Sequence, residues 1–501
     1  MKLISKSHFL QYLECPKDAW FRLHMPELPE FEISTSEQGI MDQGNEVEGY
    51  AKKLKLFAGF AEVATRGGDA QKEIARLMEE QTPAIYQPTF IADGFVIRCD
   101  FLVWNAETKK WDLYEVKGTN SLKESGPRDH LSDLTFQTIV LERARVSVGD
   151  TYIVHLNKEY IRGEELDVEQ LFIVSNCTLQ VKAKMDAVAH EMAKAKKYLT
   201  EEGEPKEGCE CHLSGRSSQC ATVERSHPEI PEYSVHDISR IGASKDKLTE
   251  LVTNGIYHLE EIDDTSDFTV VQQNQIHTHK TGEEIIDVKE IANILDGYSY
   301  PLYFFDYETF APAVPIFPGY GTYHRIPIQF SLHIIDEKGG ALRHVDYVHT
   351  ENSDPSLPVA KILAETIDPN GTVLAWNVGF ERTVTAELAE RLPEYRKVLT
   401  RICDQMQDLR DVFSKQHYVH KDFRGKSGVG PVMEALLPHM TYDHLPYTGS
   451  DVGYIWWRDI VNDGTTKEDR EKKTHLIREY CKQDTFVMVE IWRILNDLVK
   501  K

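Results

Sequence analysis

The sequence predicts an α/β protein with more than one domain, and three observations carry this prediction. The chain has 501 residues, which is more than a single hydrophobic core usually serves. Residues 86–117 alternate apolar and polar side chains with the period of a strand, and helical patterns flank them. A second apolar strand pattern, PLYFFDYETF, begins at residue 301 after a long interval without one.

The first part of the chain, residues 1–225, has the elements of one α/β domain. β-branched and aromatic residues between 86 and 117 predict a meander of strands, with Asp93-Gly94 as a turn signal. The other elements expected here are a helical region over 1–60, a helix over 128–146, a strand over 151–157 and a long helix over 178–200.

A proline-containing segment, SHPEIPEY, predicts a linker after the first domain. Residues 226–297 form the expected small helical module, with short helices over 236–265 and a polar part without defined structure over 266–297. Residues 298–501 form the second α/β domain. Its expected elements are strands near 301–310, 325–336, 345–349 and 372–376, a helix near 358–366, and helices from there to the C-terminus.

Composition and charge exclude several classes of protein. The hydrophobic fraction of 41 % is enough for packed cores and excludes wholesale disorder. No apolar run is long enough for a transmembrane helix, and the N-terminal residues lack a signal-peptide pattern, so we expect a cytoplasmic protein without membrane partners. The net charge of −24 argues against coating nucleic acid by bulk charge, but it is compatible with a nuclease, whose catalytic metals need carboxylates.

Three of the eight cysteines lie together in a polar loop, as Cys209, Cys211 and Cys220. Structural cysteines seldom cluster in such a loop, and a disulfide framework is not expected in a cytosolic chain. The thiols therefore predict a soft-metal site, for zinc or an iron–sulfur cluster, with His212 or a distant cysteine as the fourth ligand. The alternative is a group of reduced thiols without a metal.

The first acidic constellation is Asp100, Glu115 and Lys117. Glu115 and Lys117 are two residues apart in a predicted strand, so both side chains project from one face. A hairpin can bring Asp100 beside them, and the two carboxylates can then hold divalent cations while the lysine polarises an attacking water. The alternative is an ion pair on a half-buried sheet.

The second constellation is Asp306, Glu308, Glu381 and Asp484. Asp306 and Glu308 share one face of an aromatic strand, where two buried carboxylates need cations beside them. Glu381 follows the strand VLAW, and Tyr480 and Asp484 lie four residues apart on one face of a helix. The alternative for the first pair is a strand end with two solvated acids.

The first constellation resembles the RecB-type branch of the PD-(D/E)XK nucleases, through D(100), E(115)-V-K(117) and DLTFQ ending at Gln137. This resemblance implies that Gln137 contacts the active site. It also places Glu48, in Gly44-Asn-Glu-Val-Glu48, where the family has a metal-binding histidine. The opening SKSHFLQYLECP is similar to the start of iron–sulfur members of that branch. The resemblance thus implies a structural 4Fe–4S cluster on Cys15, Cys209, Cys211 and Cys220, with zinc as the alternative.

The second constellation resembles the DEDD exonucleases, which have an RNase H-like fold. The matching segments are D-Y-E at 306–308, N-V-G-F-E ending at Glu381 in place of the usual Asp, and Y-C-K-Q-D at 480–484. The resemblance implies 3′→5′ removal of nucleotides with two Mg²⁺ or Mn²⁺ ions. Asp306 would bridge both ions, Glu308 and Asp484 would hold one, Glu381 would help to hold the other, and Tyr480 would position the attacking water.

Over nearly its full length the chain resembles an uncharacterised bacterial family that joins a RecB-like module to a DEDD-like module. We expect a DNA exonuclease with a second nuclease site. One alternative is an RNA-processing exonuclease. Another is a non-catalytic nucleic-acid-binding subunit in which one module has decayed, and Glu48 and Glu381 favour this alternative. A third, an acidic protein that mimics DNA, would explain neither set of motifs. The chain has no Walker A sequence, which leaves a helicase, or a defence or repair protein, open as a partner.

Overall fold

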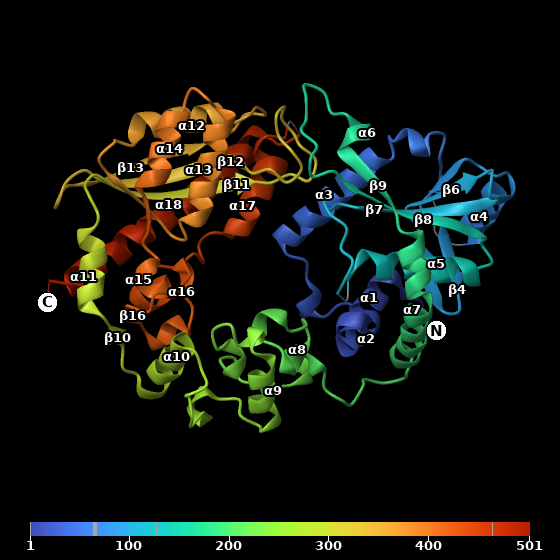
Figure 1. Ribbon diagram of the computed structural model, residues 1–501, viewed down its shortest axis with the longest axis horizontal. Helices are drawn as coiled ribbons and strands as arrows, with labels where there is room; N and C mark the ends of the chain where they lie inside the picture. Colours follow the sequence, from blue (N-terminus) through green and yellow to red (C-terminus); the bar gives the residue numbers. More distant parts are fainter. Residues whose placement is uncertain (1, 64–67, 127, 463, 501) are drawn as a thin grey trace. The chain divides into compact units, whose positions relative to one another are not determined.

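The computed structural model describes residues 2–63, 68–126, 128–462 and 464–500 (Figure 1). The predicted α/β class is confirmed, with about 48 % helix and 16 % strand in mixed sheets. The chain divides into two compact units. Unit 1 comprises Met1–His212, Ser218–Ile230 and Pro312–His324, and unit 2 comprises Leu213–Ser217, Pro231–Ala311 and Arg325–Lys501. None of the described helices has the length and apolar character needed to cross a bilayer.

Unit 1 is built around a six-stranded sheet with the order β2-β3-β6-β7-β8-β9, beside a three-stranded sheet with the order β1-β5-β4. The strands are β1 Ile4–Ser5, β2 Ala61–Glu62, β3 Ala84–Tyr86, β4 Thr89–Ala92, β5 Phe95–Arg98, β6 Phe101–Asn105, β7 Lys110–Lys117, β8 Val148–Leu156 and β9 Phe172–Asn176. The helices are α1 Lys6–Glu14, α2 Pro16–His24, α3 Thr35–Ala51, α4 Gly68–Glu79, α5 His130–Arg143, α6 Val168–Leu171, α7 Thr178–Leu199 and α8 Val223–Ser226.

The two faces of the larger sheet enclose different cores. Leu113 of β7 packs in the core that contains the buried residues of α5 and α7, whereas its neighbour Tyr114 packs against Phe57 and Phe101 on the opposite face. This alternation is the period of a strand. It places Glu115 and Lys117, which follow Leu113 in steps of two, on the face that α5 covers. The predicted turn at Asp93-Gly94 also forms, and both residues have positive φ angles, of 51° and 87°.

Unit 2 contains a five-stranded sheet with the order β13-β12-β11-β14-β15, in which β12 is antiparallel to β11 and β14 is parallel to it. Its strands are β10 Ile285–Ile286, β11 Leu302–Phe310, β12 Ile326–Ile335, β13 Leu342–Val348, β14 Thr372–Ala375, β15 Met406–Asp408 and β16 Tyr418–Val419. Its helices are α9 Lys245–Thr253, α10 Val270–Thr281, α11 Val288–Asp296, α12 Ser356–Thr366, α13 Gly379–Arg391, α14 Arg396–Gln405, α15 Asp411–Ser414, α16 Val429–Leu436, α17 Gly449–Ile455 and α18 Lys467–Leu498.

The strand β11 has one core on each face. Leu302 and Phe304 pack with the apolar residues of α18, whereas Tyr303, Phe305 and Tyr307 pack with those of α12, α13 and α14. Asp306 therefore shares the α18 face with Phe304. Helix α17 approaches β11 closely at Gly453, where a Cβ atom would lie 2.5 Å from the carbonyl oxygen of Thr309. A larger residue there would push α17 away from the strand that carries Asp306.

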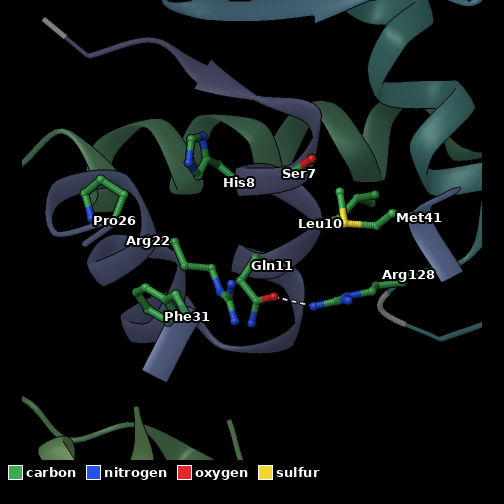
Figure 2. Close-up of a pocket in the computed structure, with 9 residues that line it drawn as sticks. All are labelled: Ser7, His8, Leu10, Gln11, Arg22, Pro26, Phe31, Met41 and Arg128. Atoms are coloured by element: carbon green, nitrogen blue, oxygen red, sulfur yellow. Dashed lines mark hydrogen bonds between the residues drawn. The ribbon is translucent and has the colours of Figure 1, made fainter. Parts of the chain in front are cut away.

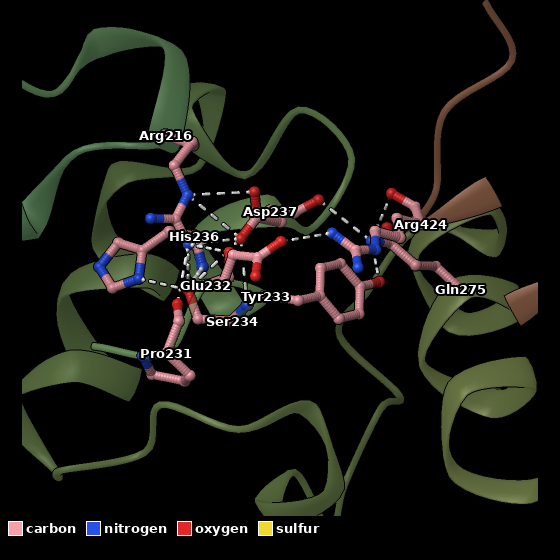
Figure 3. Close-up of polar contacts among 9 residues, drawn as sticks. All are labelled: Arg216, Pro231, Glu232, Tyr233, Ser234, His236, Asp237, Gln275 and Arg424. Carbon is pink, nitrogen blue, oxygen red and sulfur yellow. Dashed lines mark hydrogen bonds and ion pairs between the residues drawn. The ribbon is translucent and has the colours of Figure 1, made fainter. Parts of the chain in front are cut away.

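Polar side chains join the short helices of unit 2 to the rest of that unit (Figure 3). The Gln275 amide of α10 donates to Tyr233 Oη at 2.9 Å and to the carbonyl oxygen of Arg424 at 3.2 Å. Arg216 binds Asp237 with an Nη2–Oδ2 distance of 2.8 Å, and β10 pairs with β16. These contacts explain why residues from 231 onward cluster with the larger sheet of unit 2.

The prediction of a segment without defined structure at 266–297 is wrong, because this segment contains α10, β10 and α11. The buried face of α10 is formed mostly by Gln272, Gln275 and Thr278, so the apolar periodicity that normally reveals a helix is missing. Its N-terminus carries a capping box, in which Thr269 and Gln272 exchange hydrogen bonds with each other's backbone amides.

Candidate functional site

Four cysteines of unit 1 form a site that can hold a metal ion or cluster. The Sγ atoms of Cys15, Cys209, Cys211 and Cys220 all lie within 4.8 Å of one another, and those of Cys209 and Cys220 are 3.7 Å apart. Cys15 ends α1 and is the N-cap of α2, where its Sγ accepts a hydrogen bond from the Asp18 amide. The other three cysteines follow α7 in a loop with short 3₁₀ turns.

The fourth thiol of this site comes from Cys15, and His212 does not take its place. Nδ1 of His212 is hydrogen-bonded to the carbonyl oxygen of Cys209 at 2.7 Å, and its ring stacks on His227. Asp18 ties the two parts of the site together, because its carboxylate accepts hydrogen bonds from the amide and hydroxyl of Thr222. A group bound by the four thiols would thus connect α1 and α2 to a loop about 200 residues away in the sequence.

A second cluster in unit 1 joins β7 to α5. Glu115 Oε2 accepts a hydrogen bond from Gln137 Nε2 at 2.7 Å, and Glu115 Oε1 lies 2.8 Å from Lys117 Nζ. Asp133, one turn before Gln137, accepts from the same Gln137 amide at 2.9 Å and forms a short ion pair with Lys117. The motif DLTFQ contains Asp133, but only its last residue, Gln137, was predicted to belong to the site. The spacing of four residues places Asp133 and Gln137 on one helix face.

Asp100 and Glu48 flank this cluster. Asp100 is fixed by a 2.7 Å hydrogen bond from the Val116 amide to its Oδ2. Glu48 of α3 accepts hydrogen bonds from Tyr86 Oη and Gln87 Nε2 at 2.7 and 2.8 Å, so its Oε1 already has two protein partners. It is near enough to Asp100 for the two charges to repel each other.

Lys6 is a further member that the sequence did not indicate. It is the first residue of α1, and its Nζ lies 2.6 Å from Glu115 Oε1 and 3.5 Å from Asp133 Oδ2. The same two oxygen atoms are bonded to Lys117. Two ammonium groups thus share two carboxylate oxygens. A single lysine 109 residues before Glu115 has no spacing that could have revealed this contact.

The charges of this cluster are unevenly compensated. Burial alone would raise the pKa of Glu115, but Lys117 and Lys6 lower it below its usual range. Asp100 has no ion-pair partner among the described residues, and burial together with the Glu115 charge raises its pKa well above the usual value. The Oε1 atom of Gln137 is buried without a hydrogen-bond partner in the described chain. Asp100 and this amide oxygen are therefore the groups most in need of a cation.

In unit 2, Asp306, Glu308 and Cys481 bring their ligand atoms within 4.8 Å of one another. Asp306 and Glu308 come from β11, and Cys481 comes from α18 with its Sγ 3.4 Å from Asp306 Oδ2. Asp484, one turn later on α18, is close enough to raise the pKa of Glu308. The sequence identified both pairs of acids but not the thiol between them.

Glu381 enters the same cluster from the first turn of α13. Its charge is the largest electrostatic influence on Asp306, and its Oε2 atom is buried without a partner among the residues described. Asp408 holds the chain segment before Glu381, since its carboxylate accepts hydrogen bonds from the amides of Asn377 and Val378. This contact fixes the start of α13 and hence the position of Glu381.

Two tyrosines border the acids of unit 2. Tyr442 donates a short hydrogen bond to Asp484 Oδ1, and its ring lies 5.4 Å from that of Tyr480. The hydroxyl of Tyr480 is beside Gly449, where a Cβ atom would lie only 3.1 Å away. Burial and the charges of Asp484 and Glu308 raise the pKa of Tyr480. Its hydroxyl thus keeps its proton at neutral pH and can donate a hydrogen bond, but it cannot serve as a base.

No cation in the described chain compensates the acids of unit 2, since none of the four forms an ion pair there. Burial and mutual repulsion raise the pKa of Asp306 to about 8, and burial with the charge of Asp408 raises that of Glu381 to about 8. The pKa values of Glu308 and Asp484 are raised well above the usual range for the same reasons. Such a donor set fits a hard divalent cation, which prefers carboxylate oxygen.

One comparison with known proteins bears on this site. A family model described as a domain of unknown function, DUF2779, matches residues 303–428, which contain Asp306, Glu308 and Glu381. Asp484 and Tyr480 lie outside the matched segment. A comparison with curated proteins finds no match.

The first prediction concerns the pH dependence of stability. Because folding raises the pKa of Asp306 and Glu381 to about 8, the folded state binds more protons than the unfolded chain between about pH 4 and 8, and stability falls as pH rises. Without divalent metal, the thermal midpoint should drop from pH 5.5 to 8.5. Mn²⁺ should raise the thermal midpoint more at pH 8.5 than at pH 5.5. In Asp306→Asn the drop should be smaller than in the exposed control Asp497→Asn; equal drops in both variants would contradict the assignment.

The second prediction concerns the thiol site. Cys220→Ser should remove the tightly bound metal from the purified protein and lower its thermal midpoint by several degrees, because the binding free energy of a structural metal contributes to folding. Elemental analysis and calorimetry measure both effects. Cys403→Ser, a half-buried cysteine of α14, is the matched control and should change neither. Equal metal content in the two variants would exclude the four-thiol site.

The third prediction concerns Lys6. Lys6→Met should make Mn²⁺ bind to unit 1 about tenfold more tightly, because an ammonium group that competes for Glu115 is removed. The same change should destabilise the metal-free protein, which is left with fewer cations beside buried carboxylates. Mn²⁺ titration in an Asp306→Asn/Glu308→Gln background measures the affinity, with the exposed Lys72→Met as control. Weaker Mn²⁺ binding in Lys6→Met would rule out this competition.

Proposed function

We propose that the chain is a divalent-metal-dependent nuclease that hydrolyses phosphodiester bonds of DNA. Unit 2 would act as a 3′→5′ exonuclease, and unit 1 would carry a second nuclease site. The observation that carries the proposal is the gathering of Asp306, Glu308, Glu381 and Asp484, from β11, α13 and α18, into one partly buried cluster that no cation of the described chain compensates. A folded protein tolerates such a cluster when a cation belongs there.

The topology of unit 2 supports this assignment. Numbered along the chain, the strands of its large sheet have the spatial order 3-2-1-4-5, and the second strand is antiparallel to the first. This is the arrangement of the RNase H-like fold, in which the central first strand carries the leading acids. Asp306 and Glu308 lie on that strand.

In unit 2, Asp306, Glu308, Glu381 and Asp484 would hold Mg²⁺ or Mn²⁺. When bound there, such an ion would supply Lewis-acid chemistry for phosphodiester hydrolysis. Tyr480 would orient the attacking water by donating its hydroxyl proton in a hydrogen bond, and Tyr442 would hold Asp484 in place through the contact already present. The extra methylene of Glu381, relative to Asp, gives its carboxylate additional reach from α13.

In unit 1, Asp100 and Glu115 would hold the divalent ion together with the free oxygen of Gln137, which fits because that oxygen is buried without a partner in the described chain. Lys117 would stabilise negative charge on the phosphate, and Lys6 would join it once Glu115 turns to the metal. Glu48 would not bind the ion directly, because its Oε1 already accepts hydrogen bonds from Tyr86 and Gln87.

For the four thiols, the sulfur spacing favours a single zinc ion. Four thiolates around tetrahedral Zn²⁺, at about 2.3 Å from the metal, lie about 3.8 Å apart, close to the 3.7 Å between Cys209 and Cys220. A 4Fe–4S cube places iron and sulfide between the thiolates and needs wider spacing. The resemblance to iron–sulfur nucleases nevertheless keeps the cluster as the alternative. The absorption spectrum of anaerobically purified protein, with iron and zinc analysis, distinguishes them.

A second candidate for unit 1 is binding of nucleic acid without cleavage. The observation that favours it is that Lys6 and Lys117 both form ion pairs with Glu115 and Asp133. In the described chain, these ion pairs leave fewer carboxylate oxygens for a metal than in unit 2. Tight DNA binding without cleavage by an Asp306→Asn variant, in both Mg²⁺ and Mn²⁺, would select this candidate.

The fourth prediction separates the two sites. With 5′-labelled single-stranded DNA and Mn²⁺, Asp306→Asn should abolish stepwise shortening from the 3′ end, and Lys117→Ala should leave that shortening intact. Lys117→Ala should instead remove the cleavage that remains in Asp306→Asn. Asp497→Asn and Lys110→Ala, which change exposed residues, are the controls. Unchanged digestion by the Asp306→Asn/Lys117→Ala double variant would refute both sites, and faster cleavage of RNA of equal sequence would change the substrate assignment.

A further inference from the structure

A cavity of about 630 Å³ in unit 1 has no part in the mechanism above (Figure 2). It lies between α1, the end of α2 with the segment that follows it, α3, and the segment before α5. Its size is within the range of small-molecule binding pockets. The side chains that matter for its chemistry are Leu10, Gln11, Arg22, Phe31, Met41 and Arg128.

Hydrogen-bond donors dominate the polar lining of this cavity. Nε of Arg22 donates to Asp18 at 2.8 Å, and this contact leaves the two terminal nitrogens of the guanidinium without a partner in the described chain. Arg128 uses its Nη2 for Gln11 and for Glu14. The hydrogen bond from Arg128 to Gln11, which occupies the Gln11 oxygen, is drawn in Figure 2. The Gln11 amide nitrogen has no partner among the described residues. A ligand with acceptor oxygens, such as a phosphodiester, satisfies these donors.

The acids next to the cavity are already engaged. Asp18 is completely buried and accepts hydrogen bonds from Arg22 and Thr222, and Glu14 pairs with Arg128 at 2.7 Å. These contacts fix the directions of the two guanidinium groups, and the arginine nitrogens not used for them remain available. Because Cys15 is the N-cap of α2, a group bound by the four thiols would also stabilise the position of Arg22.

An apolar wall accompanies the donors. The Arg22 guanidinium lies over the Phe31 ring, with its Cζ 4.2 Å from the ring centroid. Leu10 and the half-exposed Met41 complete this wall. In proteins that bind single strands, guanidinium planes and aromatic rings stack on nucleobases, and apolar side chains pack against a base that is taken out of its stack.

The cavity adjoins the proposed nuclease site of unit 1 through α1 and the segment that leads into α5. Helix α1 carries Lys6 in the carboxylate cluster and Gln11 in the cavity, five residues apart and hence about 7.5 Å along the helix axis. Arg128 precedes α5, which carries Asp133 and Gln137 into the same cluster. A single strand of DNA with one phosphate bound at the carboxylate cluster can therefore place the neighbouring nucleotide in the cavity.

We propose that this cavity binds one nucleotide of a single-stranded DNA substrate, next to the phosphate held at the unit 1 site. Arg22, Arg128 and the Gln11 amide nitrogen bind its phosphate, and its base lies against Leu10 and Met41. This inference rests on the proposed nuclease function for its position along the strand. The binding itself depends only on the lining of the cavity.

Photocrosslinking tests the binding without requiring cleavage. A single-stranded oligonucleotide with 5-iodouracil is irradiated with the full-length protein in buffer without divalent metal, and the crosslinked peptides are mapped. Crosslinks are expected within residues 7–41. Met41→Trp, which fills the cavity from its exposed wall and leaves the ion pairs intact, should reduce them about tenfold. Ile40→Trp, at the neighbouring and more exposed position of α3, is the control and should leave them unchanged.

Kinetics in an Asp306→Asn background tests the position along the strand. Arg22→Met and Met41→Trp should raise KM for single-stranded DNA about tenfold, as expected for lost hydrogen bonds to a charged group and for a blocked base site. Turnover of bis(p-nitrophenyl) phosphate, which reaches only the metal site, should remain unchanged. Arg22→Met removes a partner of buried Asp18, so Met41→Trp keeps the test valid if that variant fails to fold.

Three outcomes are distinct. The absence of crosslinks within residues 7–41, or crosslinks there that are equally strong in Met41→Trp, would overturn the cavity proposal while the nuclease assignment stands. An unchanged KM in Met41→Trp would overturn the placement of the cavity next to the scissile phosphate. If the Asp306→Asn protein cleaves neither substrate with any divalent metal, the nuclease assignment of unit 1 fails, and crosslinks that depend on Met41 would still support nucleotide binding.

Discussion

The structure depends on how buried carboxylates are compensated. Raising the pKa of Asp306 from 3.8 to about 8 corresponds to a cost on the order of 5 kcal/mol for its charged form. In unit 1, the ammonium groups of Lys6 and Lys117 compensate the charge of Glu115 and lower its pKa despite its burial. In unit 2, the described chain provides no such cation, and four acids keep raised pKa values. The charge of Glu115 is thus compensated within the chain, whereas Asp100 in unit 1 and the four acids of unit 2 keep raised pKa values and would need an external cation.

The ion pairs of Lys6 and Lys117 with Glu115 affect metal binding in unit 1. A divalent ion that enters beside Asp100 must compete with two ammonium groups for Glu115, whereas none of the four acids of unit 2 forms an ion pair in the described chain. Metal affinity should therefore depend on pH more steeply in unit 2, where four ligands have raised pKa values and lose protons on binding, than in unit 1, where only the pKa of Asp100 is raised among the proposed carboxylate ligands. Lys6 is the more exposed of the two lysines, with 26 % of its side chain accessible against 19 % for Lys117, and is the one with more freedom to move toward a phosphate.

The sequence predicted the local geometry of both acidic clusters where a strand or helix period determined it. Asp306 shares its strand face with Phe304, and Glu115 and Lys117 share theirs, because the side-chain period of a strand is two. Lys6 and Tyr442 could not be predicted, since each reaches its partner through tertiary packing: Lys6 from 109 residues before Glu115, and Tyr442 from an irregular segment before α17. The buried face of α10 was missed for a different reason, because glutamines and a threonine form it and apolar periodicity is absent.

The position of α18 explains why the acids of unit 2 act as one group. The strand β11 can place Asp306 and Glu308 on one face, but a strand cannot surround an ion, and a ligand from another direction is needed. The 32 residues of α18 pack along that face through Val487, Ile491 and Leu495, and one turn of the helix presents Tyr480, Cys481 and Asp484. Burial of the apolar stripe of α18 thereby fixes the distance between the two pairs of acids, so the packing that stabilises the fold also assembles the candidate metal site.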